Sequence, residues 1–426
     1  MIYTVTVNPC LDVLRFLNVD APSLSDGTYR PDNPNDHEKV RPGGKGLDVS
    51  RALVCLRCET KALGFIGDQT GDIVKGLLEA EGIDHGFIES GVETRTNIIL
   101  VLQDRKSRQV LGEIRVNSSG REIPPNKFHL LYDQASRIED ADAVAISGSL
   151  NFNMQPTFYN QLIRTFKERN PHCTVMLDGP AAATAEAMTL ALHRPDYIKP
   201  NLKEFNDLLI QLSGEDNCLW RKGKAMPPGM GDEQYLEYLF TGTNQLGALP
   251  KRFVVDRQQF GDNWEPLLKN VLTIKEKFKV GVLLSLGPRG CLTATDEGEV
   301  LHAYLPELVD PKTRVGAGDS LVAGFLAEHV RQRAGNLQEA LRGAVAAATA
   351  RVCVEEYSHN IKYLDLKKYQ STFQKVKVDI YRPGEKFEPK FLDIVPPELT
   401  RFSTGSSYVA EAKPPETRKS RHTRRR

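Results

Sequence analysis

The chain contains 426 residues, of which 40% are hydrophobic and 26% are charged, and its formal net charge is +1. So much apolar sequence can bury a large core, which favours one large α/β domain with appendages. No apolar run approaches the roughly 18 residues of a transmembrane helix, the N-terminus lacks the features of a signal peptide, and the cysteines are scattered. The composition therefore excludes a membrane-spanning chain and a disulfide scaffold, and we expect a cytoplasmic enzyme.

The first predicted element is a strand that ends beside a carboxylate. Residues 1–7 alternate like a strand, and Asn8-Pro9 breaks the pattern, which leaves Asp12 just past the strand end. Ligands of open α/β sheets collect at such ends. Asp12 is therefore a candidate for accepting hydrogen bonds from a substrate, and the alternative is a turn residue after Asn-Pro.

A glycine-rich turn follows and opens a predicted helix. It reads Arg41-Pro42-Gly43-Gly44-Lys45-Gly46-Leu47-Asp48. Bare backbone at a helix start lets an anionic ligand approach, and this turn carries a cation as well. It is not a P-loop, because the spacing Gly-x-x-x-x-Gly-Lys-Ser/Thr is absent. Taken alone, it is equally compatible with an ordinary turn.

The middle of the chain alternates strand and helix signals, as a parallel sheet covered on both faces would. Buried strands are expected at 143–146, 174–177, 197–199 and 280–286, and helices at 156–167 and 181–192. Strands of a second type, 97–103 and 109–116, are joined by a turn at 104–107. With residues 13–40 they could form a small separate sheet.

Two polar motifs follow buried strands in this region. Asn201-x-x-Glu204 has the pattern of a capping box at a helix start, and that alone could explain both residues. Ser285-Leu286-Gly287-Pro288-Arg289-Gly290 ends the last buried strand. Both motifs are therefore expected at the edge of the sheet where ligands bind.

A second glycine-rich helix start lies at Arg314-Val315-Gly316-Ala317-Gly318-Asp319-Ser320-Leu321. Free amides and the positive end of the helix dipole make such a start a site for a negatively charged group. The alternative is that Asp319 only stabilises the helix terminus. Phosphoryl transfer needs amides that hold the migrating group and a base for the attacking hydroxyl, which the backbone of 316–318 and Asp319 could supply.

Two segments have weak periodicity or extreme charge. Residues 213–262 suggest an insertion, either a surface excursion or a segment that touches the nucleotide side. From Lys413 to Arg426 the tail carries seven Lys or Arg and one Glu. Such a basic tail can contact nucleic acid, but without aromatics or a folded context it is expected to be a solvated, disordered end. Nucleic acid is therefore not an expected partner.

Seven motifs in order make the chain similar to a known family. They are Asn8-Pro9-x-x-Asp12, Gly43-Gly44-Lys45-Gly46, Gly64-Phe65-Ile66-Gly67-Asp68-x-x-Gly71, Ser147-Gly148-Ser149-Leu150, Lys199-Pro200-Asn201-x-x-Glu204, Ser285-Leu286-Gly287 and Gly316-Ala317-Gly318-Asp319. The chain resembles the ribokinase-like (PfkB) carbohydrate kinases, in particular their 1-phosphofructokinase and tagatose-6-phosphate kinase branch. The resemblance covers about residues 1–212 and 263–356.

The resemblance implies a three-layer αβα Rossmann-like domain with a mainly parallel central sheet and a small β-sheet lid. We expect the kinase domain at 1–370, with the lid from about 13–40 and 95–118, followed by a C-terminal extension at 371–426. In the family such a lid covers the sugar and often mediates dimerisation, so a homodimer through the lid is a possible partner arrangement.

The resemblance also implies roles for the motif residues on the nucleotide side. Gly316, Ala317 and Gly318 would hold the phosphoryl group of ATP and Asp319 would act as the base. The expected nucleotide contacts are Lys199, Asn201, Ser285, Gly287, Gly290 and Gly318. Mg2+ would arrive with ATP, held mostly by phosphates and water, and Glu204 would order a metal-bound water.

On the sugar side, the resemblance places Asp12, Gly43 and Gly44 against the sugar ring. The cations expected to bind a second phosphate are Lys45, Arg95 and Arg115, because guanidinium groups suit bidentate phosphate binding. Each could instead be a solvated surface charge.

One position departs from the family, which usually has Asn where this chain has Asp48. A carboxylate cannot donate a hydrogen bond, so Asp48 would favour a substrate hydroxyl and disfavour a phosphate oxygen.

These inferences lead to one expected function. It is ATP-dependent phosphorylation of a phosphorylated ketohexose, with fructose 1-phosphate first and tagatose 6-phosphate second. A kinase for an unphosphorylated sugar or nucleoside is the first alternative, and it predicts that Lys45, Arg95 and Arg115 do not converge. A non-catalytic sugar-phosphate sensor is the second.

Overall fold

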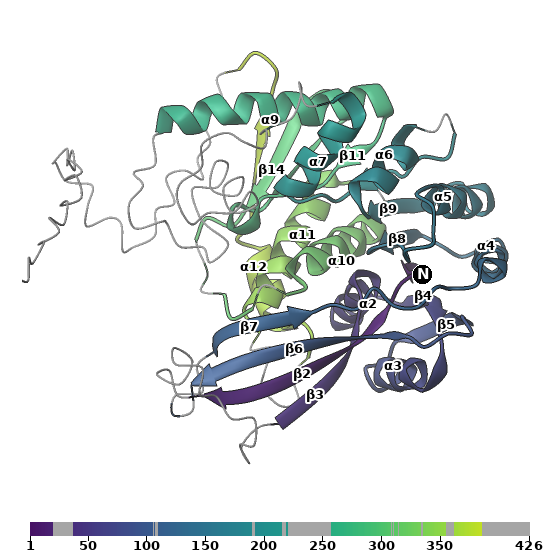
Figure 1. Cartoon of the computed structure of the whole chain (residues 1–426). Helices are drawn as coiled ribbons and strands as arrows, with labels where there is room; N and C mark the ends of the chain where they lie inside the picture. The colour runs from purple at the N-terminus through teal and green to yellow at the C-terminus, as the bar shows by residue number, and fades with distance from the viewer. Residues whose placement is uncertain are drawn as a thin grey trace, which may run out of the picture.

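The structure is a computed structural model, shown in Figure 1. It describes residues 1–19, 37–104, 106, 110–189, 192–214, 219, 257–307, 309, 311–313, 315–333, 335–354 and 362–385, with side chains at 19, 110–113 and 257–263 left out. The predicted basic tail and most of the predicted insertion lie outside the described residues. All of the motif residues that define the candidate site are described except Arg314.

A seven-stranded parallel sheet forms the centre of the molecule. Its strand order is β11-β10-β9-β8-β1-β4-β5. The strands are β1 (Ile2–Thr6), β4 (Thr60–Ile66), β5 (Asp84–Glu89), β8 (Ala143–Ser147), β9 (Thr174–Asp178), β10 (Tyr197–Ile198) and β11 (Gly281–Val282). Every printed pairing within this sheet is parallel, so the carboxyl ends of all seven strands lie at one edge. The predicted α/β class with a mainly parallel central sheet is confirmed.

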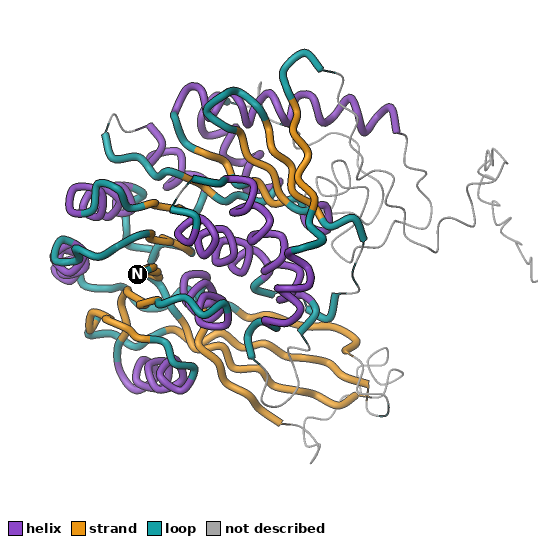
Figure 2. The backbone as a smooth tube through the Cα atoms, turned by 180° about the vertical axis from the view of Figure 1, so that it is seen from behind, coloured by secondary structure: helices purple, strands orange, loops and turns teal. Residues whose placement is uncertain are grey.

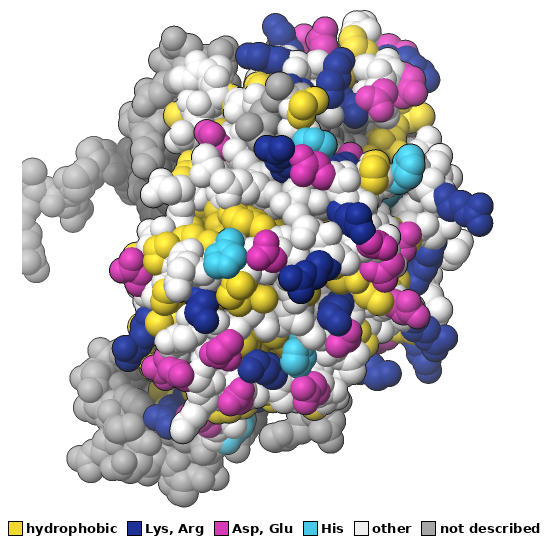
Figure 3. Space-filling model, turned by 90° about the vertical axis from the view of Figure 1, so that its right-hand side faces the viewer, with side chains coloured by type: hydrophobic (Ala, Val, Ile, Leu, Met, Phe, Trp, Pro, Cys, Tyr) yellow, Lys and Arg dark blue, Asp and Glu magenta, His cyan; other side chains and the backbone are white. Residues whose placement is uncertain are grey.

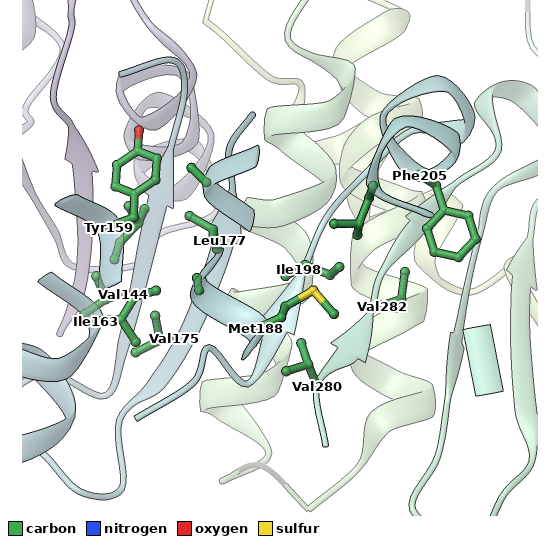
Figure 4. Packing of buried hydrophobic residues seen from close by; sticks show 14 of the residues in the cluster. Val144, Tyr159, Ile163, Val175, Leu177, Met188, Ile198, Phe205, Val280 and Val282 are labelled. Carbon is green, nitrogen blue, oxygen red and sulfur yellow. The ribbon is translucent and has the colours of Figure 1, made fainter. Parts of the chain in front are cut away.

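Helices cover both faces of this sheet because its strands alternate apolar side chains in and out (Figures 1 and 2). On one face, Tyr3, Val5 and Val144 pack in a core with helices of the middle of the chain. Those helices are α4 (Phe128–Ala135), α5 (Thr157–Arg169), α6 (Ala181–Thr189), α7 (Leu202–Ser213) and α9 (Arg257–Phe278). Figure 4 shows part of this core, where Tyr159 and Ile163 meet Val144 and Val175.

On the other face, Ile2 and Ala143 pack against a second core. Its helices are α2 (Lys45–Cys55), α10 (Ala317–Arg331), α11 (Leu337–Val352) and α12 (Leu366–Phe373). Helix α3 (Asp68–Ala80) packs with the start of α2 in a smaller cluster. Both glycine-rich helix starts therefore belong to helices on the same face of the sheet.

A separate four-stranded sheet, the lid, stands apart from the central sheet (Figure 1). Its order is β3-β2-β6-β7, with β2 (Cys10–Val19), β3 (His37–Gly43), β6 (Arg95–Asp104) and β7 (Val110–Val116). Strand β2 pairs with β6 in parallel and with β3 antiparallel. The register puts Asp12 beside Arg41 and Asn97, so the strand that follows the β1 end carries Asp12 into the lid.

A third sheet, β12-β13-β14-β15, was not predicted. Its strands are β12 (Leu284–Ser285), β13 (Cys291–Ala294), β14 (Val300–Tyr304) and β15 (Lys377–Tyr381). The predicted strand 280–286 is therefore split between two sheets at Leu283. Because β15 pairs with β14, folded structure extends past the boundary predicted at residue 370.

The surface gives no sign of a large patch of one charge on the face shown in Figure 3, where acidic and basic side chains are interspersed. Within the described residues, no helix is long and apolar enough to cross a membrane.

Candidate active site

The start of α10 is a bare helix terminus with a buried acid in its first turn. Gly316 is the N-cap residue in a left-handed conformation with φ 76°, and it has no side chain to occupy the amides that follow. Ser320 N donates to Gly316 O at 2.9 Å, which closes the first turn of the helix. Asp319 is only 9% exposed. The geometry therefore combines an anion-binding helix start with a shielded carboxylate.

Burial, with the charges of Asp48 and Asp178 added, raises the pKa of Asp319 to about 8. Lys45 and Lys199 act in the opposite direction, since their charges favour the ionised carboxylate. The pKa of Asp319 is thus close to the value that suits a general base near neutral pH.

Two lysines and two carboxylates lie at the carboxyl ends of β9 and β10. Lys45 Nζ lies 2.9 Å from Asp178 Oδ1 and 3.3 Å from Glu204 Oε1, and Lys199 Nζ lies 3.1 Å from Asp178 Oδ2. Burial opposes ionisation of Asp178, but Lys199 and Lys45 outweigh it and hold its pKa below the ordinary value. The charges of Asp178, Glu204 and Asp319 raise the pKa of Lys45 against the effect of its burial. Lys45 therefore stays charged, and the ion pair with Asp178 holds Lys199 beside it.

Lys199 points at the start of α10. A Cβ placed on Gly318 would lie 3.2 Å from Lys199 Nζ, so the absence of a side chain at 318 lets the ammonium approach the backbone. The Lys199 side chain is 5% exposed. A buried cation and helix amides thus face the same small volume.

Asn201 and Glu204 form the predicted capping box. Glu204 N donates to Asn201 Oδ1 at 2.8 Å and Asn201 N donates to Glu204 Oε2 at 2.9 Å. Asn201 also forms a bridge to Ser285, whose amide donates to Pro200 O at 3.0 Å. The capping prediction is confirmed, while the nucleotide role of these residues stays a prediction.

The turn after Ser285 is closed by glycine geometry. Leu286 N donates to Gly290 O at 2.8 Å, and both Gly287 and Gly290 have positive φ, 56° and 84°. A Cβ on Gly290 would lie 2.0 Å from Ala303 O, so only glycine fits there. The predicted pocket-forming turn is present as backbone, next to the Asn201 end of the site.

Asp12, at the end of the site predicted to bind the sugar, is held by the lid. Asn97 Nδ2 donates to Asp12 Oδ1 at 2.9 Å, and Arg41 Nε lies 3.3 Å from Asp12 Oδ2. A Cβ on Gly43 would meet Asp12 Oδ1 at 2.6 Å, so the glycine turn and Asp12 are in close contact. At Gly44, with φ 128°, it would meet Thr6 at 2.8 Å.

The three predicted phosphate-binding cations do not share one set of contacts. Lys45 pairs with Asp178 and Glu204, as described above. Arg95 donates to Asn8 O at 3.1 and 3.0 Å and to Ser118 O at 2.8 Å. Arg115 pairs with Ile99 across the lid, which places it on the same sheet face as Asp12, and it is exposed. The structure therefore ties Lys45 and Arg95 into the protein and presents Arg115 at the lid surface.

Asp48 lies between the two ends of the site. Burial raises its pKa, against the charges of Arg51, Arg41 and Arg351, and Arg51 Nη1 lies 3.3 Å from Asp48 Oδ1. Its charge acts on Asp319, and that of Asp12 acts on it. Asp48, in place of the usual Asn, thus adds a carboxylate that interacts electrostatically with both Asp319 and Asp12.

Several residues of this cluster were missed from the sequence. Asp178 is the buried partner of two lysines, and Arg41 holds Asp12. The local signals were the position of Asp178 at a strand end, in a segment 178–181 that differs from the usual family pattern, and that of Arg41 before Pro42-Gly43. Their partners are distant in sequence, 133 residues away for Lys45 and Asp178.

In the described part of the chain, no group of three or more His, Cys, Asp or Glu side chains could hold a metal ion. Glu204 is the carboxylate of the capping box, and its two oxygens already contact Lys45 and Asn201 N. This donor set suits a contact through water better than direct coordination. A hollow of about 460 Å³ lies elsewhere in the protein, lined by Tyr3, Lys61 and Gln134 among others. None of the candidate site residues lines it.

A bare helix start, a shielded acid and fixed lysines at strand ends are what an enzyme needs to hold and transfer a phosphoryl group. The chain belongs to the pfkB family of carbohydrate kinases, whose model matches residues 8–223 and 252–362. It is accordingly a kinase of the carbohydrate class, with ATP as the phosphoryl donor.

Individual relatives extend over most of the chain. A 1-phosphofructokinase of Bacillus subtilis (strain 168) is 28% identical over 358 residues, which is 84% of this chain and 94% of that protein. A 1-phosphofructokinase of Borreliella burgdorferi is 25% identical over 351 residues, covering 82% and 91%. Both relatives are matched along nearly their whole length.

Solved structures share the fold. Phosphofructokinase-2 from Escherichia coli in complex with fructose-6-phosphate matches with a TM-score of 0.61 and 22% identity, covering 88% of this chain and 98% of that one. A possible 1-phosphofructokinase from Thermotoga maritima gives 0.60 and 22%, covering 89% and 99%. At this identity the likeness concerns the fold alone.

Proposed function

We propose that this chain phosphorylates a free hydroxyl of a phosphorylated ketohexose with ATP, with fructose 1-phosphate as the first candidate and tagatose 6-phosphate as the second. One observation carries the chemistry: Asp319 is buried in the first turn of α10, beside Gly318 and the ammonium of Lys199. The choice of sugar is supported by the names of the relatives, two 1-phosphofructokinases aligned over more than four fifths of this chain.

In the proposed step, Asp319 accepts the proton of the attacking sugar hydroxyl. The new O–P bond forms as the bond between the γ-phosphorus and the bridging oxygen of ADP breaks. Negative charge on the transferring group is stabilised by the amides at the start of α10 and by Lys199 and Lys45. Asp178 keeps the two ammonium groups in place, because its ion pairs are 2.9 and 3.1 Å. The proton released by the sugar hydroxyl thus has a named acceptor, Asp319.

Mg2+ is proposed to act at the Glu204 side. It would neutralise charge on the nucleotide phosphates and be held mainly by them and by water. The chain's part is to orient that water through Glu204, whose carboxylate is fixed by Asn201 N at 2.9 Å. Asn201, Ser285 and the turn at Gly287 and Gly290 are proposed to shape the nucleotide pocket.

The sugar is proposed to lie between Asp12 and the turn of Gly43 and Gly44, under the lid. On the Asp12 face of the lid, Lys39 and Arg115 stand in one row with Ile99 and Leu14. A phosphate on the sugar would meet this row, with Arg115 as the main ligand. Burial, together with the charges of Arg51 and Arg41, lowers the pKa of Lys39, and a phosphate bound beside it would favour its charged form.

Lys45, Arg95 and Arg115 share no described contact, which favours one alternative, a kinase for an unphosphorylated sugar. Lys45 and Arg95 are engaged within the protein, as that alternative predicts. Steady-state kinetics on matched pairs, fructose against fructose 1-phosphate and tagatose against tagatose 6-phosphate, separates the two functions. Our proposal requires kcat/KM at least about 100-fold higher for a phosphorylated sugar, since a phosphate ligand contributes at least two tenfold steps of binding. Equal values would support the alternative.

The outer face of the lid is proposed to pair with a second copy of the chain. The register aligns Val40, Val13, Ile98 and Val116 in one row, and Val40, Ile98 and Val116 are 36%, 46% and 56% exposed. Adjacent exposed apolar side chains on one sheet face are typical of a protein interface. Sedimentation equilibrium of Ile98→Asp should show a loss of dimer, whereas a wild-type monomer would contradict the pairing.

A further inference from the structure

One tyrosine near the end of the described chain is held between two arginines. Tyr363 lies with its ring 4.5 Å from the guanidinium carbon of Arg51 and 4.4 Å from that of Arg351. Tyr363 is 6% exposed and Arg351 is 3% exposed. A ring between two guanidinium groups is strongly fixed, because each cation is attracted to one of its faces. We call these three residues the Tyr363 stack.

The hydroxyl of Tyr363 touches the catalytic turn. It lies 3.5 Å from Gly316 O, the carbonyl that accepts the first hydrogen bond of α10. A Cβ placed on Gly316 would lie 1.9 Å from this hydroxyl and 3.2 Å from Arg351 Nε. The stack thus fills the space behind the residue from which the phosphoryl-holding turn begins, and leaves no room for a side chain there.

The stack also connects the two glycine-rich helix starts. Arg51 is the seventh residue of α2, and it pairs with Asp48 at 3.3 Å and with Glu81 at 2.7 Å. Arg351 lies on α11, which packs along α10. Tyr363 therefore joins the helix of the proposed sugar turn to the turn of the proposed base.

We propose that Tyr363 and the two arginines are positioning residues for phosphoryl transfer. The stack fixes the backbone of Gly316, and through it the amides of the α10 start and the carboxylate of Asp319. This inference rests on the proposed function, since it assumes that the α10 start holds the transferring group. A displacement of about 1 Å at such a site can lower the rate roughly 100-fold. A packing contact behind the turn can therefore have a large effect on the rate of phosphoryl transfer.

Two changes at Tyr363 test the proposal. Tyr363→Phe removes the hydroxyl contact and keeps the ring between the arginines, so kcat should fall about 3- to 10-fold with both KM values within about twofold. Tyr363→Leu removes the stack and should lower kcat roughly 100-fold. Tyr369→Phe is the matched control, because Tyr369 is also buried, at 5%, and donates to Glu328 Oε1 at 2.7 Å on the far side of α10. This control should lower the Tm and leave kcat unchanged.

A double-mutant cycle gives a readout that general destabilisation would not produce. Gly316→Ala places a methyl group against the Tyr363 hydroxyl, so its loss of kcat should be smaller in the Tyr363→Phe background than in the wild type. Additive losses, or a kcat for Tyr363→Phe equal to that of the wild type, would overturn the inference. A wild-type protein without kinase activity on fructose, tagatose or either of their phosphates would instead overturn the proposed function.

Discussion

The two ends of the candidate site hold their charges in different ways. At the phosphoryl end, Asp178 and Lys199 are 1% and 5% exposed, and their partners come from the ends of central strands and from α2. At the sugar end, the acid and cations sit on the lid, where Arg41 and Asp12 are 10% and 13% exposed and Arg115 is exposed. The first end is built into the core, and the second is carried by a separate sheet.

This difference indicates a division of labour. Buried ion pairs with fixed geometry suit a step that is common to a whole family of kinases, because low dielectric strengthens their effect on a migrating charge. Exposed cations on a separate sheet can change without disturbing the core. We therefore expect substitutions at the phosphoryl end to act on kcat, and those on the lid to act on KM.

The largest effect is expected at Asp319. Asp319→Ala should lower kcat by roughly 10²- to 10⁴-fold, because the attacking hydroxyl loses its proton acceptor, while binding of sugar and nucleotide is retained. Turnover and calorimetric titration with ATP and the sugar phosphate measure the two quantities. Near-normal turnover in Asp319→Ala would show that the base lies elsewhere, and matched loss of binding would show that Asp319 holds substrate.

The pH dependence should have opposite signs for activity and for stability. Burial raises the pKa of Asp319 to about 8 from 3.8, so kcat/KM of the free enzyme should rise with pH and level off above about 8. This limb is distinguishable from ionisation of the sugar phosphate, whose second pKa is about 6. Between pH 3.8 and about 8 the folded chain binds more protons at Asp319 than the unfolded chain does, so this residue makes stability fall as pH rises.

Asp319→Asn removes that proton-linked loss. Its Tm relative to the wild type should therefore increase from pH 5 to pH 8, measured by differential scanning fluorimetry in matched buffers. A difference that stays constant across this range would mean that the Asp319 pKa is close to its value in the unfolded chain.

The phosphoryl end could be predicted from sequence where its contacts are local. The Gly316 to Asp319 turn and the capping box of Asn201 and Glu204 span four residues each, and short patterns at a helix start have few alternative structures. The pairing of Asp178 with Lys45 and Lys199 depends on strand order, which no local pattern encodes. The Tyr363 stack could not be predicted either, because it joins residues that are distant in sequence.

In the lid, alternation predicted the strands of residues 97–103 and 109–116 and the turn between them, and the structure has β6 and β7 there. The parallel pairing of β2 with β6 joins segments about 85 residues apart, so neither the Asn97 contact to Asp12 nor the carbonyl contacts of Arg95 could be predicted. The continuous apolar run at 280–286 hid a change of sheet, because buried strands of both sheets have the same composition.

The lid cations should give a smaller effect, confined to the sugar. Arg115→Ala should raise the KM for the sugar phosphate about tenfold, since an exposed guanidinium is accessible to a phosphate. Arg95→Ala should raise the same KM and also lower the Tm, because the carbonyls of Asn8 and Ser118 lose their donor. Equal KM values for fructose 1-phosphate in the wild type and Arg115→Ala would remove Arg115 from the phosphate site.

The smallest effect is expected at Asp48, and it links the two ends. Asp48→Asn keeps the size of the side chain and removes a charge that raises the pKa of Asp319, so the acid limb of kcat/KM should move to lower pH. The same change reduces repulsion of a phosphate near Arg41, so the KM for the sugar phosphate should fall by less than about tenfold. Full pH profiles of both variants, with Asp72→Asn on the surface of α3 as a charge-matched control, measure the shift. An unmoved limb with a lower KM would place Asp48 at the sugar end alone, because its charge would then reach the lid cations without reaching the proposed base.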